Sequence, residues 1–136
     1  MKIFYGKAIY DKKEINASIS VLKNKSLTLI DGPLVKKLEK NISLLFGKKY
    51  GLMVNSGSSA NLLALASLNL KKGDEVITPT LTFSTTVAPI YQLGLKPYFI
   101  DVEKNTFVSK IDQIEKEINK KTKAIMIPNL LGNVPD

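Results

Sequence analysis

Cysteine and histidine are both absent from this chain of 136 residues. Their absence excludes disulfides, thiolate zinc sites, cysteine and histidine nucleophiles, and histidine general bases. Any chemistry must therefore come from lysine, serine, threonine, tyrosine or carboxylate groups, or from a bound cofactor. The sequence predicts no metal site, and the lack of cysteine suits a cytoplasmic protein.

Arginine is absent as well, because all twenty basic residues are lysine, and with twelve acidic residues the net charge is +8. Lysine neutralises phosphate, but the bidentate recognition of guanine edges normally uses arginine. The lysines are spread along the chain and mixed with acids, as in "KIDQIEKEINKKTK", which is typical of solvated helix faces. We predict no nucleic-acid partner, and a non-catalytic basic binding domain stays as an alternative of another class.

Long apolar runs are also missing. No segment approaches the roughly 20 apolar residues of a membrane span, and the opening "MKIFYGKAIYDKKE" lacks the apolar core of a signal peptide. The sequence therefore predicts no membrane association and a cytoplasmic location. With 44% hydrophobic residues, the length and composition suit one soluble globular domain.

Two amphipathic helices are expected in the first third of the chain. Residues 10–25 place apolar side chains at helical spacing, and Asp11 with Glu14 predicts a capping box at the start. The loop "SLTLIDGP" follows, and then Pro33 suits the first turn of a second helix that Gly47 closes. The apolar face of this second helix is formed by Leu34, Leu38, Ile42 and Leu45.

From Tyr50 onward, short apolar runs alternate with helical patterns. This alternation predicts an α/β fold with right-handed crossovers and a mainly parallel sheet with helices on both faces. The expected strands are "YGLMV", "EVITP", "KPYFIDV" and "KAIMIP", and the expected helices between them cover about residues 58–70, 84–92 and 110–119. The last strand is followed by "NLLGNVPD", where the next crossover should begin, so the chain is expected to be truncated.

The turn "NSGSSAN" lies where a strand would lead into a helix, at the edge of the sheet where ligands gather in α/β folds. Backbone amides in the first turn of a helix attract phosphate, and Gly57 with Ser58 and Ser59 would supply close backbone approach, amides and hydroxyls. The alternative is that Ser56 or Ser58 simply caps the helix. The common nucleotide-binding motifs G-x-G-x-x-G and G-x-x-x-x-G-K-[ST] do not occur.

A second turn, "ITPTLTFSTTVAPI", follows the next strand with five threonines and one aromatic residue, Phe83. A phosphate cup beside an aromatic plate suits a phosphorylated planar ring. The alternative is that Phe83 belongs to the core and that the threonines satisfy turn amides.

Taken together, "GLMVNSGSSANLLAL", "GDEVITPTLTFSTTVAPI", "KPYFIDV" and "KTKAIMIPNLLGNVPD" resemble the N-terminal part of the DegT/DnrJ/EryC1/StrS family of pyridoxal-phosphate-dependent nucleotide-sugar aminotransferases. The resemblance implies part of a fold-type I large domain, with residues 1–48 as an N-terminal helical segment and residues 49–136 as the first part of the α/β domain that binds pyridoxal 5'-phosphate (PLP). It also implies a homodimer.

By the same resemblance, Ser58 and Ser59 bind the cofactor phosphate after the turn residue Gly57, and Phe83 stacks on the pyridine ring. One departure is Asn129, because family members commonly have histidine there, so Asn129 is only a candidate pocket residue. The lysine that forms a Schiff base with the cofactor, and the aspartate that pairs with its ring nitrogen, are expected beyond Asp136. The chain alone is therefore expected to be inactive.

For the whole enzyme, the resemblance implies transfer of an amino group, commonly from glutamate through pyridoxamine phosphate (PMP), to a keto group of a nucleotide-linked sugar. Cell-surface polysaccharide biosynthesis is the expected setting. The segments "YGKAIYDKKEINA", "NSGSSANLL" and "LLGN" also resemble the 3-dehydrases of CDP-4-keto-6-deoxyglucose, in which histidine replaces the Schiff-base lysine and PMP helps to remove a sugar hydroxyl. That dehydrase activity is the alternative within the family.

Overall fold

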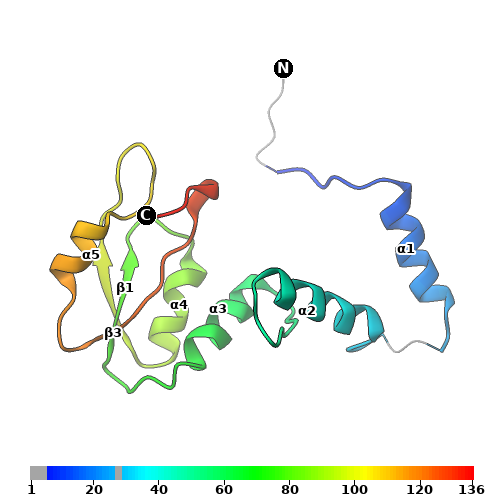
Figure 1. Cartoon of the computed structure of the whole chain (residues 1–136), viewed down its shortest axis with the longest axis horizontal. Coiled ribbons are helices and arrows are strands. Elements are labelled where there is room, and N and C mark those ends of the chain that lie inside the picture. Colours follow the sequence, from blue (N-terminus) through cyan, green and yellow to red (C-terminus); the bar gives the residue numbers. More distant parts are fainter. Residues whose placement is uncertain (1–5, 27–28) are drawn as a thin grey trace. The chain divides into compact units, whose positions relative to one another are not determined.

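The computed structural model describes residues 6–26 and 29–136. The chain forms two compact units, one ending at Met53 and the other running from Val54 to Asp136 (Figure 1). The domain boundary expected after residue 48 stays a prediction.

The first unit contains helix α1, Lys12–Lys23, which begins with the predicted capping box. The Lys13 amide donates to Asp11 Oδ1 at 2.6 Å, and the Asp11 amide donates to Glu14 Oε2 at 2.8 Å. No residue of α1 is buried. The helix therefore depends on local signals more than on packing within its unit.

Helix α2, Pro33–Leu45, confirms the second predicted helix. Pro33 occupies its first turn, and Gly47 adopts a left-handed φ of +62° just after it ends. Leu38 and Ile42 of its apolar face line a groove of about 280 Å³ together with Leu52 and Met53. Residues 27–28 of the expected preceding loop lie outside the described part of the chain.

The predicted strand over residues 50–54 is wrong. This segment belongs to no strand, because its backbone bonds to α2: the Met53 amide donates to Glu39 Oε1 at 2.8 Å. Gly51 lies so close to α2 that a Cβ atom there would stand 2.6 Å from the Glu39 carbonyl oxygen. The apolar pattern suits a strand, but a strand requires a neighbouring strand to accept and donate its backbone bonds.

The second unit alternates helices and strands as predicted, and its sheet is fully parallel with the order β2-β1-β3. Three of the four predicted strands form. The elements are α3 (Gly57–Ala66), β1 (Glu75–Pro79), α4 (Ser84–Gln92), β2 (Lys96–Ile100), α5 (Ile111–Glu117), β3 (Thr122–Ile125) and a short 3-10 helix η1 (Leu130–Gly132).

Helix α3 is shorter than predicted, ending at Ala66 instead of about Leu70. The chain leaves the helix through tight turns, in which the Leu68 amide donates to the Leu65 carbonyl at 3.2 Å, and Asn69 takes a left-handed φ of 50°. Leu70 then packs against the core from outside the helix. An apolar residue at helical spacing thus contributes to the core without belonging to the helix.

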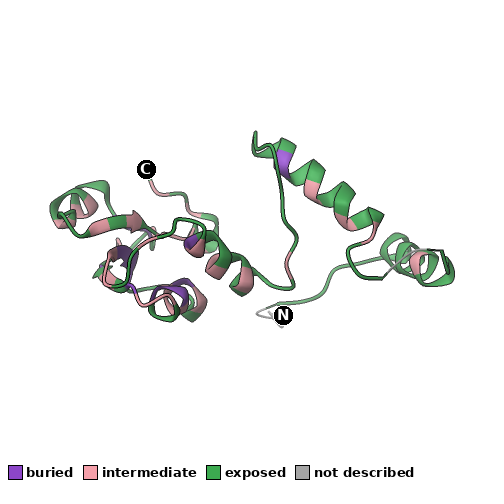
Figure 2. Ribbon diagram, turned by 90° about the horizontal axis from the view of Figure 1, so that it is seen from below, coloured by how far each residue is buried: buried purple, intermediate pink, exposed green. Residues whose placement is uncertain are grey.

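Both faces of β1 are covered. Val76 packs with Leu65, Ile90 and Leu95 on the face of α3 and α4, while the adjacent Ile77, which points to the opposite face, is also 0% exposed. Figure 1 shows α5 on one side of the sheet and α4 on the other. Figure 2 shows buried positions along the sheet and α4 of this unit. The predicted α/β architecture, with helices on both faces, is confirmed.

Candidate functional site

The first turn of α3 holds the two predicted phosphate-binding serines. Ser56 is the N-cap, and its Oγ accepts a hydrogen bond of 3.1 Å from the Ser59 amide. Ser59 Oγ in turn donates to Asn55 Oδ1 at 2.7 Å. Ser56, and not Ser58, therefore performs the capping role considered as the alternative.

Gly57 and Ser58 occupy the first two positions of α3 and are exposed. Amides at these positions have no acceptor within the helix, and the helix dipole places partial positive charge beside them. An added Cβ at Gly57 would meet nothing within 4 Å, so the approach to these amides is open. The turn is chemically suited to an anion.

Phe83 precedes α4 as its N-cap and is 71% exposed. It therefore does not belong to the core of the described chain. The turn around it is held by the Thr86 amide, which donates to the Phe83 carbonyl at 2.9 Å, and by a bond of 2.9 Å between the hydroxyls of Thr82 and Thr86. In the described part of the chain, these threonine hydroxyls thus bond to each other and not to turn amides as the alternative held, while the Phe83 side chain is exposed to solvent.

The two turns are brought together because α3 packs against α4. Asn61 Nδ2 donates to the Thr85 carbonyl oxygen at 3.2 Å and so joins the two helices close to their starts. A cleft of about 170 Å³ runs between them. Its lining consists of Ser58, Ser59, Leu62, Thr85, Ala88, Pro89 and Gln92.

Sequence reasoning assigned no role to Asn61. The signal available was an amide side chain inside the apolar stretch "ANLLALA", which calls for a polar partner when the helix packs. The partner itself lies 24 residues away and becomes evident only in the folded unit.

Asn129, the candidate pocket residue, lies elsewhere. It is exposed at the N-cap of η1, where its carbonyl accepts from the Gly132 amide at 3.1 Å. Among the described residues that line the cleft, Asn129 does not occur. The structure thus brings the turns of Ser58 and Phe83 together without joining Asn129 to them.

Among the described residues, the pKa is perturbed in two groups, Lys36 of the first unit and Tyr98 of the second. Hydrogen bonds to Asp31 and Glu39, with ion-pair distances of 2.8 and 3.3 Å, raise the pKa of the Lys36 ammonium. A hydrogen bond to Glu117 raises the pKa of Tyr98. Both perturbations come from local pairs in the structural framework.

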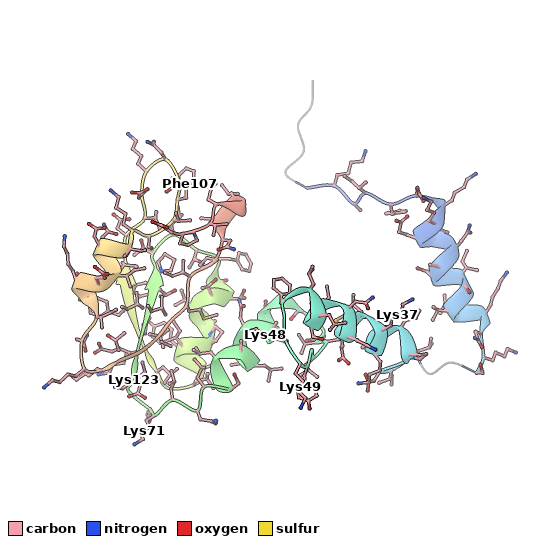
Figure 3. All side chains as sticks on the ribbon, in the orientation of Figure 1. Lys37, Lys48, Lys49, Lys71, Phe107 and Lys123 are labelled. Atoms are coloured by element: carbon pink, nitrogen blue, oxygen red, sulfur yellow. The ribbon has the colours of Figure 1, made fainter. Side chains whose placement is uncertain are left out.

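Two lysines of the α/β unit lie at the edge of the sheet away from the two turns. Lys71 precedes β1 and Lys123 lies near the start of β3, at the opposite edge of the sheet from the turn that follows β1. Figure 3 shows both side chains extending outward at the end of this unit away from the loop of Phe107. Such positions agree with solvated lysines.

In the described ranges, 6–26 and 29–136, no group of three or more acidic residues is arranged to hold a metal ion. Over the same described part of the chain, the helices are too short or too polar to cross a bilayer.

Comparison with known proteins extends the argument from the site to the chain as a whole. The sequence model of the DegT/DnrJ/EryC1/StrS aminotransferase family matches residues 8–136. The chain belongs to this family. The match includes both candidate turns and the three strands of the sheet.

Within the DegT/DnrJ/EryC1/StrS family, the chain is 43% identical over 133 residues to GDP-4-keto-6-deoxy-D-mannose 3-dehydratase of Yersinia pseudotuberculosis, covering 93% of this chain and 33% of that protein. It is 46% identical over 103 residues to the lipopolysaccharide biosynthesis protein RfbH of Salmonella typhimurium, covering 70% and 24%. The chain therefore spans a third or less of the length of these curated relatives.

A solved family structure, Spr1654 from Streptococcus pneumoniae in its PLP form, superimposes with a TM-score of 0.88 at 31% identity. The superposition covers 100% of this chain and 34% of that one. The predicted family and fold class are thus confirmed, while the roles of Gly57, Ser58, Ser59, Phe83 and Asn129 stay predictions.

Proposed function

We propose that this chain forms the N-terminal part of a PLP-dependent aminotransferase that acts on a keto group of a nucleotide-linked sugar. One observation carries the proposal: the open first turn of α3 and the exposed aromatic residue before α4 belong to helices joined by the Asn61 hydrogen bond. Membership of an aminotransferase family and the likeness to a structure solved in its PLP form support it.

The residues present fit PLP, which combines a phosphate with a planar ring. Gly57, Ser58 and Ser59 would hold the phosphate through first-turn amides and hydroxyls, and Phe83 would stack on the ring. When bound, PLP supplies the electron sink and carries the amino group between donor and sugar. The protein's own contribution at this site is anchoring and orientation.

The remaining parts of the proposal concern the complete enzyme. Glutamate is the proposed amino donor, and the enzyme is a cytoplasmic homodimer. The pathway is the biosynthesis of lipopolysaccharide or a related cell-surface polysaccharide, for which the similarity to RfbH is the support.

A second candidate is a PMP-dependent 3-dehydratase that uses the same cofactor site. The identity of 43% to GDP-4-keto-6-deoxy-D-mannose 3-dehydratase favours it. The two reactions differ in their product: the aminotransferase adds an amino group to the sugar, whereas the dehydratase removes the hydroxyl at its third carbon.

The cofactor site is tested by PLP titration of the full-length protein and of a variant carrying Ser58→Ala and Ser59→Ala. Loss of two hydroxyls that bond to a charged phosphate is expected to weaken binding about tenfold or more. Ser67→Ala is the matched control, because the Ser67 hydroxyl donates to the Ala64 carbonyl, at the far end of α3 from the proposed site.

Full-length protein that fails to bind PLP, or a double serine variant that binds like the wild type, contradicts the proposed site. The reaction is then identified by mass spectrometry of the product formed from a nucleotide-linked 4-keto sugar and glutamate. A product with an added amino group supports the aminotransferase, and a product that has lost one hydroxyl supports the dehydratase.

A further inference from the structure

Helix α4 contains a proline at position 89, inside the helix and fully buried. Proline has no amide hydrogen, so it cannot donate to the carbonyl four residues earlier, and its ring crowds that carbonyl. The acceptor affected is the Thr85 carbonyl, in the first turn of α4 and two residues after Phe83. The proline therefore deprives this carbonyl of its usual donor within the helix.

The missing donor is replaced from the neighbouring helix. Asn61 Nδ2 donates to the Thr85 carbonyl oxygen at 3.2 Å. Asn61 is partly buried on α3, two residues after Ser59. A bond that would ordinarily close within α4 is thus made between α3 and α4.

The bond lies where it can fix the position of the Ser58 turn relative to the Phe83 turn. Each turn is already fixed internally, one by the bond from the Ser59 amide to Ser56 Oγ and the other by the pair Thr82 and Thr86. Among the described residues, the Asn61 bond is the side-chain hydrogen bond that links α3 to α4. Leu65 of α3 and Ile90 of α4 also belong to one buried apolar cluster, but apolar packing is not directional.

We propose that Asn61 is a positioning residue that fixes the phosphate turn of α3 relative to the aromatic residue at the start of α4. The inference rests on the proposed function, because it assumes that one phosphorylated planar cofactor engages both turns. A rigid ligand that is bound at its phosphate and at its ring binds tightly only when the two sets of contacting groups lie at the correct distance from each other.

The first test is Asn61→Ala in the full-length protein, with PLP as the probe. Two quantities are measured: the dissociation constant of PLP and the circular dichroism that the bound cofactor acquires from its surroundings. Loss of the bond is expected to weaken PLP binding by about threefold to tenfold and to alter the dichroism of the fraction that is bound.

Asn119→Ala is the control, because it also removes a long-range amide bond, from Asn119 Nδ2 to Glu75 Oε2 at 2.9 Å, but away from both turns. It is expected to leave PLP affinity and dichroism unchanged. If Asn119→Ala has the same effect on PLP as Asn61→Ala, the effect comes from general destabilisation and the proposal is overturned.

A purely structural role, in which Asn61 only satisfies the Thr85 carbonyl, is distinguished from the positioning role by adding the substitution Pro89→Ala. Alanine restores the amide hydrogen at position 89, so α4 can satisfy the Thr85 carbonyl itself. In the Pro89→Ala background, the stability cost of Asn61→Ala should shrink, but its effect on PLP affinity should persist because the link between the helices is still missing.

Recovery of PLP affinity in the doubly substituted protein, or wild-type affinity and dichroism in Asn61→Ala, overturns the positioning role. If Asn61→Ala does not fold, the same comparison is made between Pro89→Ala and the doubly substituted protein. Failure of the wild-type protein to bind PLP overturns the proposed function. Failure of the present inference looks different: the wild-type protein binds PLP, and the Asn61→Ala variant binds it with the same affinity and dichroism.

Discussion

At the scale of single residues, neighbouring serines in one turn have different tasks. Ser56 and Ser59 bond to each other and complete the start of α3. Ser58 is exposed at the second position of the helix and is free of the capping role. A serine-rich turn therefore supports both a helix cap, at Ser56 Oγ, and a candidate anion site that includes the exposed Ser58.

Replacement of Phe83 by alanine tests the aromatic half of the proposed site. The ring is 71% exposed, so its loss should leave the stability of the cofactor-free protein nearly unchanged. PLP affinity, measured by titration of the full-length protein, should fall about threefold to tenfold because stacking is lost. Phe83→Trp keeps an aromatic face and should retain binding. Unchanged affinity in Phe83→Ala would remove Phe83 from the site.

The hydrogen bond of Tyr98 predicts how the stability of the fold depends on pH. Its hydroxyl donates to Glu117 Oε2 at 2.5 Å, and this bond raises the pKa of Tyr98 above its ordinary value of 10.0. Because the pKa is higher in the folded state than in the unfolded state, the bond contributes stability that is fully present below about pH 10 and is lost as the pH rises through the folded-state pKa.

Tyr98→Phe should therefore melt at a lower temperature than the wild type at about pH 8, and the difference should narrow above about pH 10. Thermal unfolding followed by circular dichroism measures it. Tyr91→Phe is the control, since Tyr91 is 61% exposed. A melting difference that stays constant across this pH range would show that the Tyr98 hydroxyl does not stabilise the fold through its neutral form.

At the scale of elements, α1 is a helix that is stabilised by local capping interactions with little tertiary packing. None of its residues is buried, and isolated helices of this length are marginal in water. Its capping box satisfies first-turn amides that would otherwise have no acceptor. The cap therefore accounts for a larger share of the stability of α1 than it would in a buried helix.

Asp11→Ala should accordingly destabilise α1 by about 1 kcal/mol. Hydrogen exchange is the suitable measurement, because the amides of α1 should exchange faster while those of β1 should not change. Lys25→Ala lies beyond the end of the helix and should leave both rates unchanged. Equal protection of α1 in the wild type and in Asp11→Ala would contradict the importance of the cap.

At the scale of the whole molecule, the α/β unit is organised around its central strand. β1 pairs with both β2 and β3, and Val76, Ile77 and Thr78 are each 0% exposed. Helices lie on both sides of this strand (Figure 1). Its buried side chains therefore contribute strongly to the stability of the unit.

Ile77→Ala should lower the free energy of unfolding by about 2–5 kcal/mol, because it leaves a cavity in a fully buried position. Denaturant unfolding measures the change. Ile125→Ala is the matched control, since Ile125 is the β3 partner of Ile77 in the sheet register and is 49% exposed. Similar losses in the two variants would contradict the central role of β1.

Several features were predictable because their causes are local. The capping box of α1 lies within four consecutive residues, and Pro33 with Gly47 bounds α2 closely. The predicted limits of α4, Ser84–Gln92, match the structure. The turn of Phe83 follows β1 as predicted, and the turn of Ser58 begins α3 although no strand directly precedes it.

Other features were not predictable because they depend on distant partners. The apolar segment 50–54 has the composition of a strand, yet its Met53 amide bonds to Glu39 of α2. The position of Asn129 away from the cleft likewise follows from the path of the chain after β3. In each case the outcome depends on which groups the folded backbone brings within hydrogen-bonding distance.

The motifs of the sequence by themselves identified the family through their resemblance to it. The sequence also determined most of the helices and strands and placed Ser58, Ser59 and Phe83 near helix starts, because capping, helical spacing and strand composition act over a few neighbouring residues. Only the tertiary structure decided that three strands pair and that Asn61 supplies the donor Pro89 lacks. That hydrogen bond joins residues 24 positions apart, and such a contact exists only after the sheet has brought α3 and α4 together.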